Sequence, residues 1–152
     1  MDFIVYVDRL PKPGETVIGG GFEMQPGGKG ANQAVAAARL GAASYLVSRV
    51  GSDYVGKLLL ENAVANGVDV TCVKIDPEAH SGVALIIVGE GGENVIAVAP
   101  GVDLRISPAD VEDALPAIRS SSVVLAQLEV PLETALRAVK LAKDWGRLTV
   151  LN

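Results

Sequence analysis

Residues 26–32 read Pro-Gly-Gly-Lys-Gly-Ala-Asn and lead directly into an alanine-rich run. Glycine-rich turns that open into helices often bind phosphate through backbone N–H groups. This turn lacks the spacing of a Walker A loop, because Gly30 follows Lys29 and no Ser or Thr comes next, and Gln33 breaks the dinucleotide-binding pattern. Lys29 and Asn32 instead offer donors and an acceptor that suit a polyhydroxyl ligand. The alternative is that the glycines serve only the backbone at a helix start, and spacing alone does not decide between the two.

A second candidate is Glu129, which follows the apolar run 123–128 and precedes Pro131, where a helix is expected to begin. A carboxylate at the carboxyl end of a parallel strand lies where α/β proteins bind their ligands. The alternative is an acidic residue that stabilises the helix start through the helix dipole. Both interpretations remain open on the sequence alone.

Composition and charge exclude several classes of function. The chain has 152 residues and a formal charge of −5, with acidic and basic residues interspersed, so we expect no nucleic-acid partner. No apolar run approaches the ~18 residues that span a bilayer, so we expect no membrane segment. The single cysteine, Cys72, forms no intrachain disulfide, which fits a cytoplasmic protein. The single histidine, His80, has no partner that indicates a metal site or catalysis.

The elements that hold these residues follow from the hydrophobic pattern and from the positions of Gly and Pro. Strands are expected at 3–7, 16–25, 44–50, 70–75, 82–88, 94–99, 123–128 and 148–152. Helices are expected at about 30–40, from Ser52 or Asp53 to Asn66, from Ser107-Pro108 to about 118, and at 131–146. The glycine-rich turn that joins the strands at 82–88 and 94–99 predicts a β-hairpin.

Two kinds of β structure are expected. The later strands alternate with helices, which predicts an α/β core with a parallel sheet, flanking helices and right-handed crossovers. The early strands and the 82–99 hairpin have no helices between partners, so we expect a small β-sheet lid. The chain therefore divides into a lid, residues 1–25 and 82–99, and a partial α/β core, residues 26–81 and 100–152. Because its last strand is of the kind found inside parallel sheets, we expect a piece of a longer protein.

Several stretches together resemble one family. GGKGANQAVAAARLGA is similar to the signature near the amino end of the ribokinase and phosphofructokinase-B family of sugar kinases. MDFIVYVDRLPKPGETV resembles the first lid strand of that family, and SGVALIIVGEGGENVIAVAPG resembles its second pair of lid strands. VGSDYVGKLLLENAVANGVDV and QLEVPLE are similar to segments of its core. The resemblance covers essentially the whole chain and implies a ribokinase-like fold, with an α/β core and a β-sheet lid over the sugar.

The resemblance also implies a function and a set of binding residues. The family reaction would be ATP-dependent phosphorylation of D-ribose to ribose 5-phosphate with Mg²⁺, in a homodimer joined through the lid, and a role for a monovalent cation stays open. The sugar would be bound by Asp2, by Glu129 and by the glycine-rich turn. The residues of that turn are Gly28, Lys29, Gly30, Ala31 and Asn32.

Some parts of the family pattern are not found in residues 1–152. The first core strand and the Asn of an Asn-x-Asp sugar motif would precede Met1, and the nucleotide site, the magnesium motif and the catalytic base would follow Asn152. We therefore expect no catalytic base in this chain, no bound cofactor and no activity by this amino-terminal half alone. PGVD at 100–103 replaces a common Gly-Ala-Asn, and we attach no function to the change.

Two alternatives to a ribose kinase stay open. One is a kinase of the same family for another sugar or for a nucleoside. The other is a non-catalytic module that binds sugar or forms dimers. An in-frame Gly-Ala-Gly-Asp in the downstream coding sequence would favour a kinase, and a stop codon directly after Asn152 would favour the module.

Overall fold

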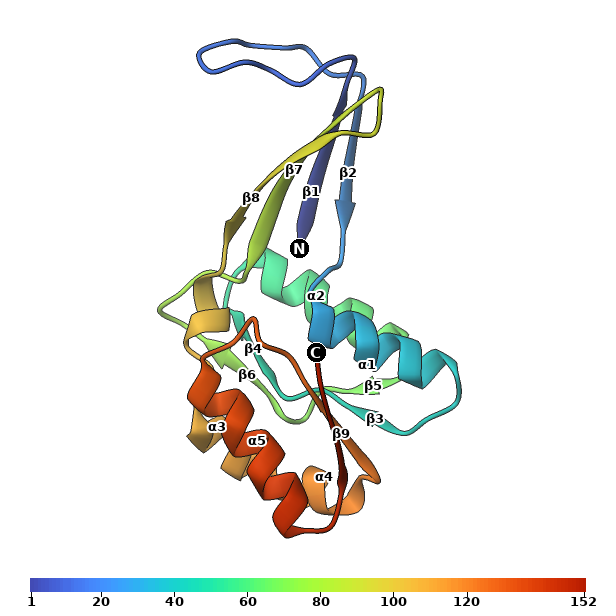
Figure 1. Ribbon diagram of the computed structural model, residues 1–152, viewed down its shortest axis with the longest axis vertical. Helices are drawn as coiled ribbons and strands as arrows, with labels where there is room; N and C mark the ends of the chain where they lie inside the picture. Colours follow the sequence, from blue (N-terminus) through green and yellow to red (C-terminus); the bar gives the residue numbers. More distant parts are fainter.

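In a computed structural model that describes all 152 residues, a four-stranded β-sheet stands on a layer of helices and short strands (Figure 1). The sheet consists of β1 (Asp2–Val7), β2 (Gly21–Gln25), β7 (Val83–Gly89) and β8 (Asn94–Ala99), in the order β2-β1-β7-β8. β1 is parallel to β7, whereas the two outer strands are antiparallel to their neighbours. Two stretches that are far apart in the sequence thus form one sheet.

Parallel strand pairs and helices make up the rest of the molecule. The first half contains α1 (Lys29–Arg39), β3 (Ser44–Tyr45), β4 (Ser48–Gly51), α2 (Tyr54–Ala65), β5 (Val68–Asp69) and β6 (Val73–Asp76). The second half contains a 3-10 helix (Gly101–Leu104), α3 (Pro108–Asp113), α4 (Leu115–Ser120), β9 (Val123–Ala126), α5 (Leu132–Asp144) and β10 (Leu148–Leu151). β3 pairs with β5, β4 with β6 and β9 with β10, all in parallel. The predicted α/β class is confirmed.

The helix predicted from Ser107 to about residue 118 is two helices. α3 begins after Ser107, as the Ser-Pro pair predicted, and Ser107 and Asp110 form a capping box there. α3 ends and α4 begins near Pro116, which has no N–H to continue the hydrogen bonding and disfavours helical backbone in the preceding residue. No helix of the chain combines the length and the apolar character that crossing a membrane requires.

Several predicted strands are shorter or interrupted. The strand expected at 16–25 pairs only over β2. Gly19, just before it, passes so close to β1 that a Cβ there would lie 2.5 Å from the Tyr6 carbonyl oxygen. The strand expected at 44–50 is divided into β3 and β4, because its two halves pair with different strands, β5 and β6. The segment expected at 70–75 likewise contributes β6 only from Val73 onward.

A buried ionic cluster joins the two halves of the core. The Asp110 carboxylate accepts hydrogen bonds from Arg49 Nε at 2.9 Å and Nη2 at 3.0 Å, and Lys74 Nζ lies 2.9 Å from Oδ1. Ser107 donates its N–H at 2.8 Å and its hydroxyl at 3.1 Å, and Arg49 also bonds to Asp76. Burial alone would raise the pKa of Asp110, but the bonds from Arg49, Lys74 and Ser107 outweigh burial and hold that pKa well below its usual range.

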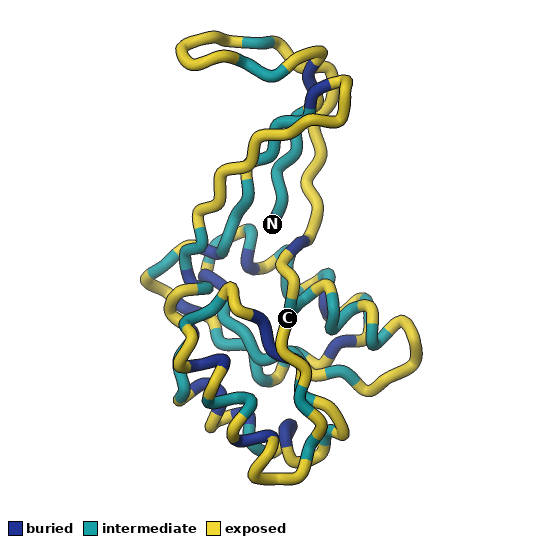
Figure 2. The backbone as a smooth tube through the Cα atoms, in the orientation of Figure 1, coloured by how far each residue is buried: buried dark blue, intermediate teal, exposed yellow.

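The four-stranded sheet is poorly covered by the chain itself. Its outer strands, β2 and β8, are exposed along their whole length (Figure 2). Phe22, Ile96 and Val98 on these strands leave large apolar side chains in contact with solvent. Exposed apolar surface of this kind is typical of protein interfaces.

Candidate functional site

The glycine-rich turn presents backbone N–H groups at the start of α1. Gly28 caps this helix with φ of 99°, a left-handed conformation that glycine adopts without steric cost. Asn32 donates its N–H to the Gly28 carbonyl oxygen at 2.8 Å, but no side chain caps this end of α1, so the N–H groups of Lys29, Gly30 and Ala31 have no partner within the helix. The glycines therefore do serve the backbone, as the alternative interpretation requires. The same geometry leaves donors that can bind an oxygen atom.

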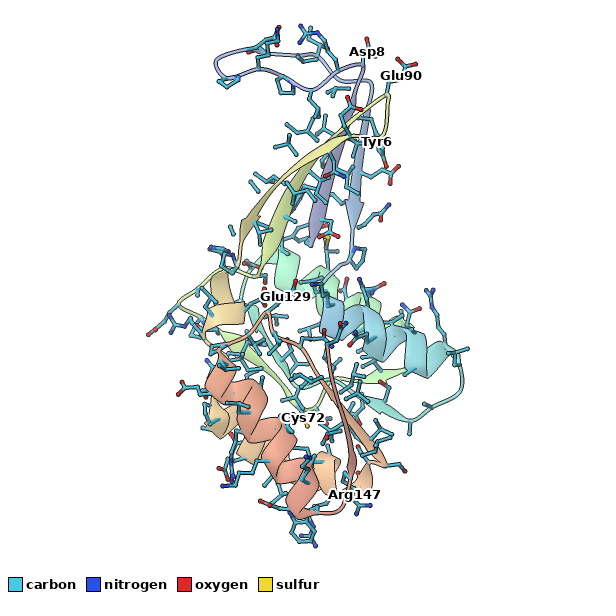
Figure 3. The ribbon with its side chains drawn as sticks, in the orientation of Figure 1. Tyr6, Asp8, Cys72, Glu90, Glu129 and Arg147 are labelled. Carbon is cyan, nitrogen blue, oxygen red and sulfur yellow. The ribbon has the colours of Figure 1, made fainter.

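Glu129 meets this turn from the second half of the core. It follows β9, and its Oε1 lies 2.7 Å from Lys29 Nζ. Figure 3 shows Glu129 beside the beginning of α1. Because the two side chains are 61% and 55% exposed, the ion pair contributes little to stability. The ion pair instead places a carboxylate acceptor and an ammonium donor side by side at the start of α1.

Asp2 reaches the turn from the four-stranded sheet. A Cβ at residue 27 would lie 2.6–2.8 Å from the carboxylate atoms of Asp2, so a side chain there would displace this carboxylate. In the sheet register Asp2 lies beside Ala84, which in turn lies beside Val98. These aliphatic residues share a face of the sheet with Asp2. The sequence did not identify them, because alternation alone does not reveal which residues of separate strands are in register.

A large hollow of about 1010 Å³ opens next to the turn. Its lining includes five of the predicted site residues, Gly28, Lys29, Gly30, Ala31 and Glu129. Asp2 touches the turn but does not line the hollow. Asn32 is exposed on the first turn of α1 and also lies outside the lining. The structure thus brings together residues 28–31 of the turn, Glu129 and Asp2, whereas Asn32 does not line the hollow.

Asp103, to which the sequence analysis assigned no role, also lines the hollow. Its carboxylate packs directly against Gly82. Burial raises the pKa of Asp103, and the negative charge of Glu129 raises it further. The Met1 ammonium group and His80 lower this pKa but do not cancel the effect of burial. The hollow therefore contains two acidic side chains, Asp103 and Glu129. The only sequence signal for this was the Asp in PGVD, where the related pattern has Asn.

The arrangement has the chemistry of a site for hydroxyl groups. The carboxylates of Asp2 and Glu129 accept hydrogen bonds, and Lys29 and the first-turn N–H groups of α1 donate them. A polyhydroxyl ligand needs both kinds of partner. No group of three or more His, Cys, Asp or Glu side chains is placed to hold a metal ion. We assign no metal ligand among these residues.

Comparison with known proteins bears on what this site binds. Residues 1–150 match the pfkB family of carbohydrate kinases. The chain belongs to this family. It is 43% identical over 152 residues to a ribokinase of Bacillus subtilis, an alignment that covers 100% of this chain and 52% of the relative. It is 36% identical over 152 residues to a deoxyribokinase of Salmonella typhi, covering 100% of this chain and 50% of the relative. This pfkB-family chain spans about half the length of the curated relatives it matches.

Solved structures agree with the family assignment. The ribokinase of Arabidopsis thaliana, complexed with ribose and ATP, matches this chain with a TM-score of 0.88 and 32% sequence identity. The match covers 99% of this chain and 49% of that chain. The ribokinase-like fold that the sequence resemblance implied is confirmed. The roles of the individual site residues stay predictions.

Proposed function

We propose that residues 1–152 form the sugar-binding part of a kinase that transfers the γ-phosphoryl group of ATP to D-ribose, giving ribose 5-phosphate. The observation that carries this proposal is the convergence of Lys29, Glu129 and Asp2 on the turn before α1, in a chain 43% identical to a ribokinase. Sugar hydroxyls donate to the two carboxylates and accept from Lys29 and the free N–H groups of α1. The turn thus binds sugar rather than phosphate.

In this mechanism the residues of the chain hold and orient the sugar. Phosphoryl transfer depends mainly on positioning the reactants and on stabilising charge at the transferring group. In a complete kinase of this kind, ATP would supply the phosphoryl group and Mg²⁺ would neutralise its charge. Residues 1–152 contain no site that we assign to either, nor a catalytic base. We infer that this part of the kinase has no activity by itself.

A kinase for deoxyribose is the second candidate, because a deoxyribokinase is 36% identical over the whole chain. The two sugars differ by one hydroxyl group, and a site that bonds a hydroxyl discriminates strongly against the analogue that lacks it.

The test uses the protein encoded by the whole open reading frame that contains residues 1–152. We expect its kcat/KM for ribose to be at least about tenfold above its kcat/KM for deoxyribose, fructose and adenosine. Steady-state assays of ATP consumption with each substrate measure these values. The chain of residues 1–152 alone is the negative control, and we expect it to consume no ATP. A higher value for deoxyribose would favour the second candidate. A higher value for fructose or adenosine would contradict both.

We further propose that two copies of the protein associate through the four-stranded sheet. Ile86 and Ile96 are register partners and share one face with Ile4, whereas Leu85 lies on the other face with Phe3. Leu85 is 56% and Ile96 52% exposed, which leaves apolar surface on both faces for a partner.

A charged side chain in an apolar interface is costly to bury, so Leu85→Lys or Ile96→Lys is expected to convert dimers to monomers. Light scattering of each variant measures the change and shows which face forms the contact. Glu90→Lys, at the exposed hairpin turn, changes the charge without touching either face and is expected to leave the dimer intact. A dimer that persists in both sheet variants would contradict this proposal.

A further inference from the structure

The segment that carries Glu129 makes a second side-chain contact with α1. Gln127 Nε2 donates a hydrogen bond to Gln33 Oε1, across 94 positions of the sequence. Each of the two residues lies in a stretch that resembles the kinase family, Gln33 in GGKGANQA and Gln127 in QLEVPLE. The function proposed above uses neither side chain.

The two contacts between this segment and α1 have the same spacing on both sides. Gln33 follows Lys29 by four residues, so both side chains project from one face of α1, with a rise of ~6 Å between them. Gln127 and Glu129 are two residues apart, and two residues of chain span at most ~7 Å. Because the spacings agree, the hydrogen bond between the amides and the ion pair form side by side.

The two contacts differ in their exposure to solvent. The side chains of Lys29 and Glu129 are 61% and 55% exposed, whereas Gln127 is only 9% exposed. Gly30 lies directly against Gln127, since a Cβ there would be 3.9 Å from Gln127 Cγ. Water competes for an exposed ion pair, but breaking a buried hydrogen bond leaves its polar groups unsatisfied. The amide pair is therefore the rigid contact, and the ion pair is the one that rearranges.

A rigid contact beside a mobile one suits a site that binds hydroxyl groups. To accept a hydrogen bond from a sugar, Glu129 exchanges part of its contact with Lys29. The exposed ion pair cannot hold the segment in place during that exchange. The amide pair lies beside the carboxylate and stays formed, so the position of Glu129 relative to α1 is kept.

We propose that Gln127 and Gln33 are positioning residues of the sugar site, which fix the distance between Glu129 and the glycine-rich turn before α1. This inference rests on the proposed function, because it takes Glu129 as an acceptor for the sugar. Neither amide contacts the sugar, and both act through Glu129. The alternative is a packing contact that stabilises the core and has no effect on the geometry of the site.

The test uses the protein encoded by the whole open reading frame, with Gln127→Met, Gln33→Met and the double variant. Met keeps the length and unbranched shape of Gln and removes the amide. We expect each single variant to lower kcat/KM for ribose about 10- to 100-fold, the cost of a misplaced group, and to keep KM for ATP within about twofold. Gln33 is only partly buried, so Gln33→Met provides a folded variant if Gln127→Met does not fold.

The double variant is expected to lose no more than either single variant, because the two amides act as one unit. Additive losses would overturn the proposal. In a Glu129→Ala background, Gln127→Met is expected to change kcat/KM by less than about twofold, because no carboxylate is left to position. A full further loss in that background would also overturn the proposal.

Glu129→Ala alone separates this inference from the proposed function. A loss in Glu129→Ala without a loss in the amide variants would overturn the positioning role and leave the sugar site standing. Unchanged activity of Glu129→Ala would contradict the sugar site itself, and the positioning role with it.

Crystal structures of the variants give a readout that does not depend on kinetics. In Gln127→Met the distance between Lys29 Nζ and Glu129 Oε1, now 2.7 Å, is expected to exceed the ~4 Å limit of an ion pair. The matched control is Asn62→Leu, which removes another amide pair, with Asn66 on α2, outside the lining of the hollow. It is expected to change neither this distance nor kcat/KM. An unchanged distance in a folded Gln127→Met variant would overturn the proposal.

Discussion

Asp110→Ala is expected to lower the free energy of unfolding of this chain by about 3–5 kcal/mol. Natural domains have a total stability of about 5–15 kcal/mol, so this loss is a large share of the total. Asp110 is 2% exposed, and its carboxylate bonds to Arg49 at 2.9 and 3.0 Å. Its removal leaves the charges of Arg49 and Lys74 without this counter-charge and takes the capping box from α3. Urea denaturation followed by circular dichroism measures the loss.

Asp113→Ala is the matched control for this experiment. Its carboxylate contacts the same Lys74 from the same helix, but it is 67% exposed. Exposed ion pairs contribute little, so the expected loss is below about 1 kcal/mol. Equal losses in the two variants would show that burial of the Asp110 cluster is not what stabilises the core.

The pH dependence gives a second check on Asp110. Because the folded protein lowers the pKa of this carboxylate, its ionised form stabilises the fold at any pH above the unfolded value of about 4. This contribution is lost as the pH falls below that value toward the lower folded pKa. The stability difference between the wild type and Asp110→Ala is therefore expected to narrow between pH 7 and pH 3.

The sequence predicted most reliably what local signals determine. The helix start at Ser107-Pro108, the glycine-rich turn before α1 and the position of Glu129 after β9 each depend on a few neighbouring residues. Alternation of strands and helices predicted the α/β class for the same reason. These features follow from backbone geometry, hydrogen-bond capacity and hydrophobic period, all of which can be read from short windows.

What the sequence could not provide depends on contacts between distant residues. The register that places Ala84 and Val98 on the face of Asp2 is set by pairing across the sheet, and no local pattern specifies it. The approach of Asp103 to Gly82 is also long-range, so Asp103 was not identified as lining the hollow. The division of the 44–50 strand depends on which strands lie beside it.

The remaining prediction concerns the sugar site itself. In the protein extended by its coding sequence, Glu129→Ala is expected to lower kcat/KM for ribose about 5- to 150-fold, which corresponds to about 1–3 kcal/mol. The physical reason is that a bound sugar hydroxyl loses its carboxylate acceptor, while Lys29, now 2.7 Å from Glu129 Oε1, loses its counter-charge. Asn32→Ala is expected to act in the same direction if the first turn of α1 contacts the sugar.

Glu133→Ala provides the control, since Glu133 is an exposed carboxylate in the first turn of α5, close to Glu129 in the sequence. It changes the net charge by the same amount and is expected to leave kcat/KM within about twofold of the wild type. Glu129→Gln separates charge from shape, because the amide still accepts one hydrogen bond but no longer neutralises Lys29. An intermediate loss for Glu129→Gln is therefore expected. A kcat/KM within about twofold of the wild type for both Glu129→Ala and Asn32→Ala would contradict this assignment. Glu129 would then serve only the start of α5, and the glycine-rich turn only the backbone of α1. The sugar would be bound elsewhere.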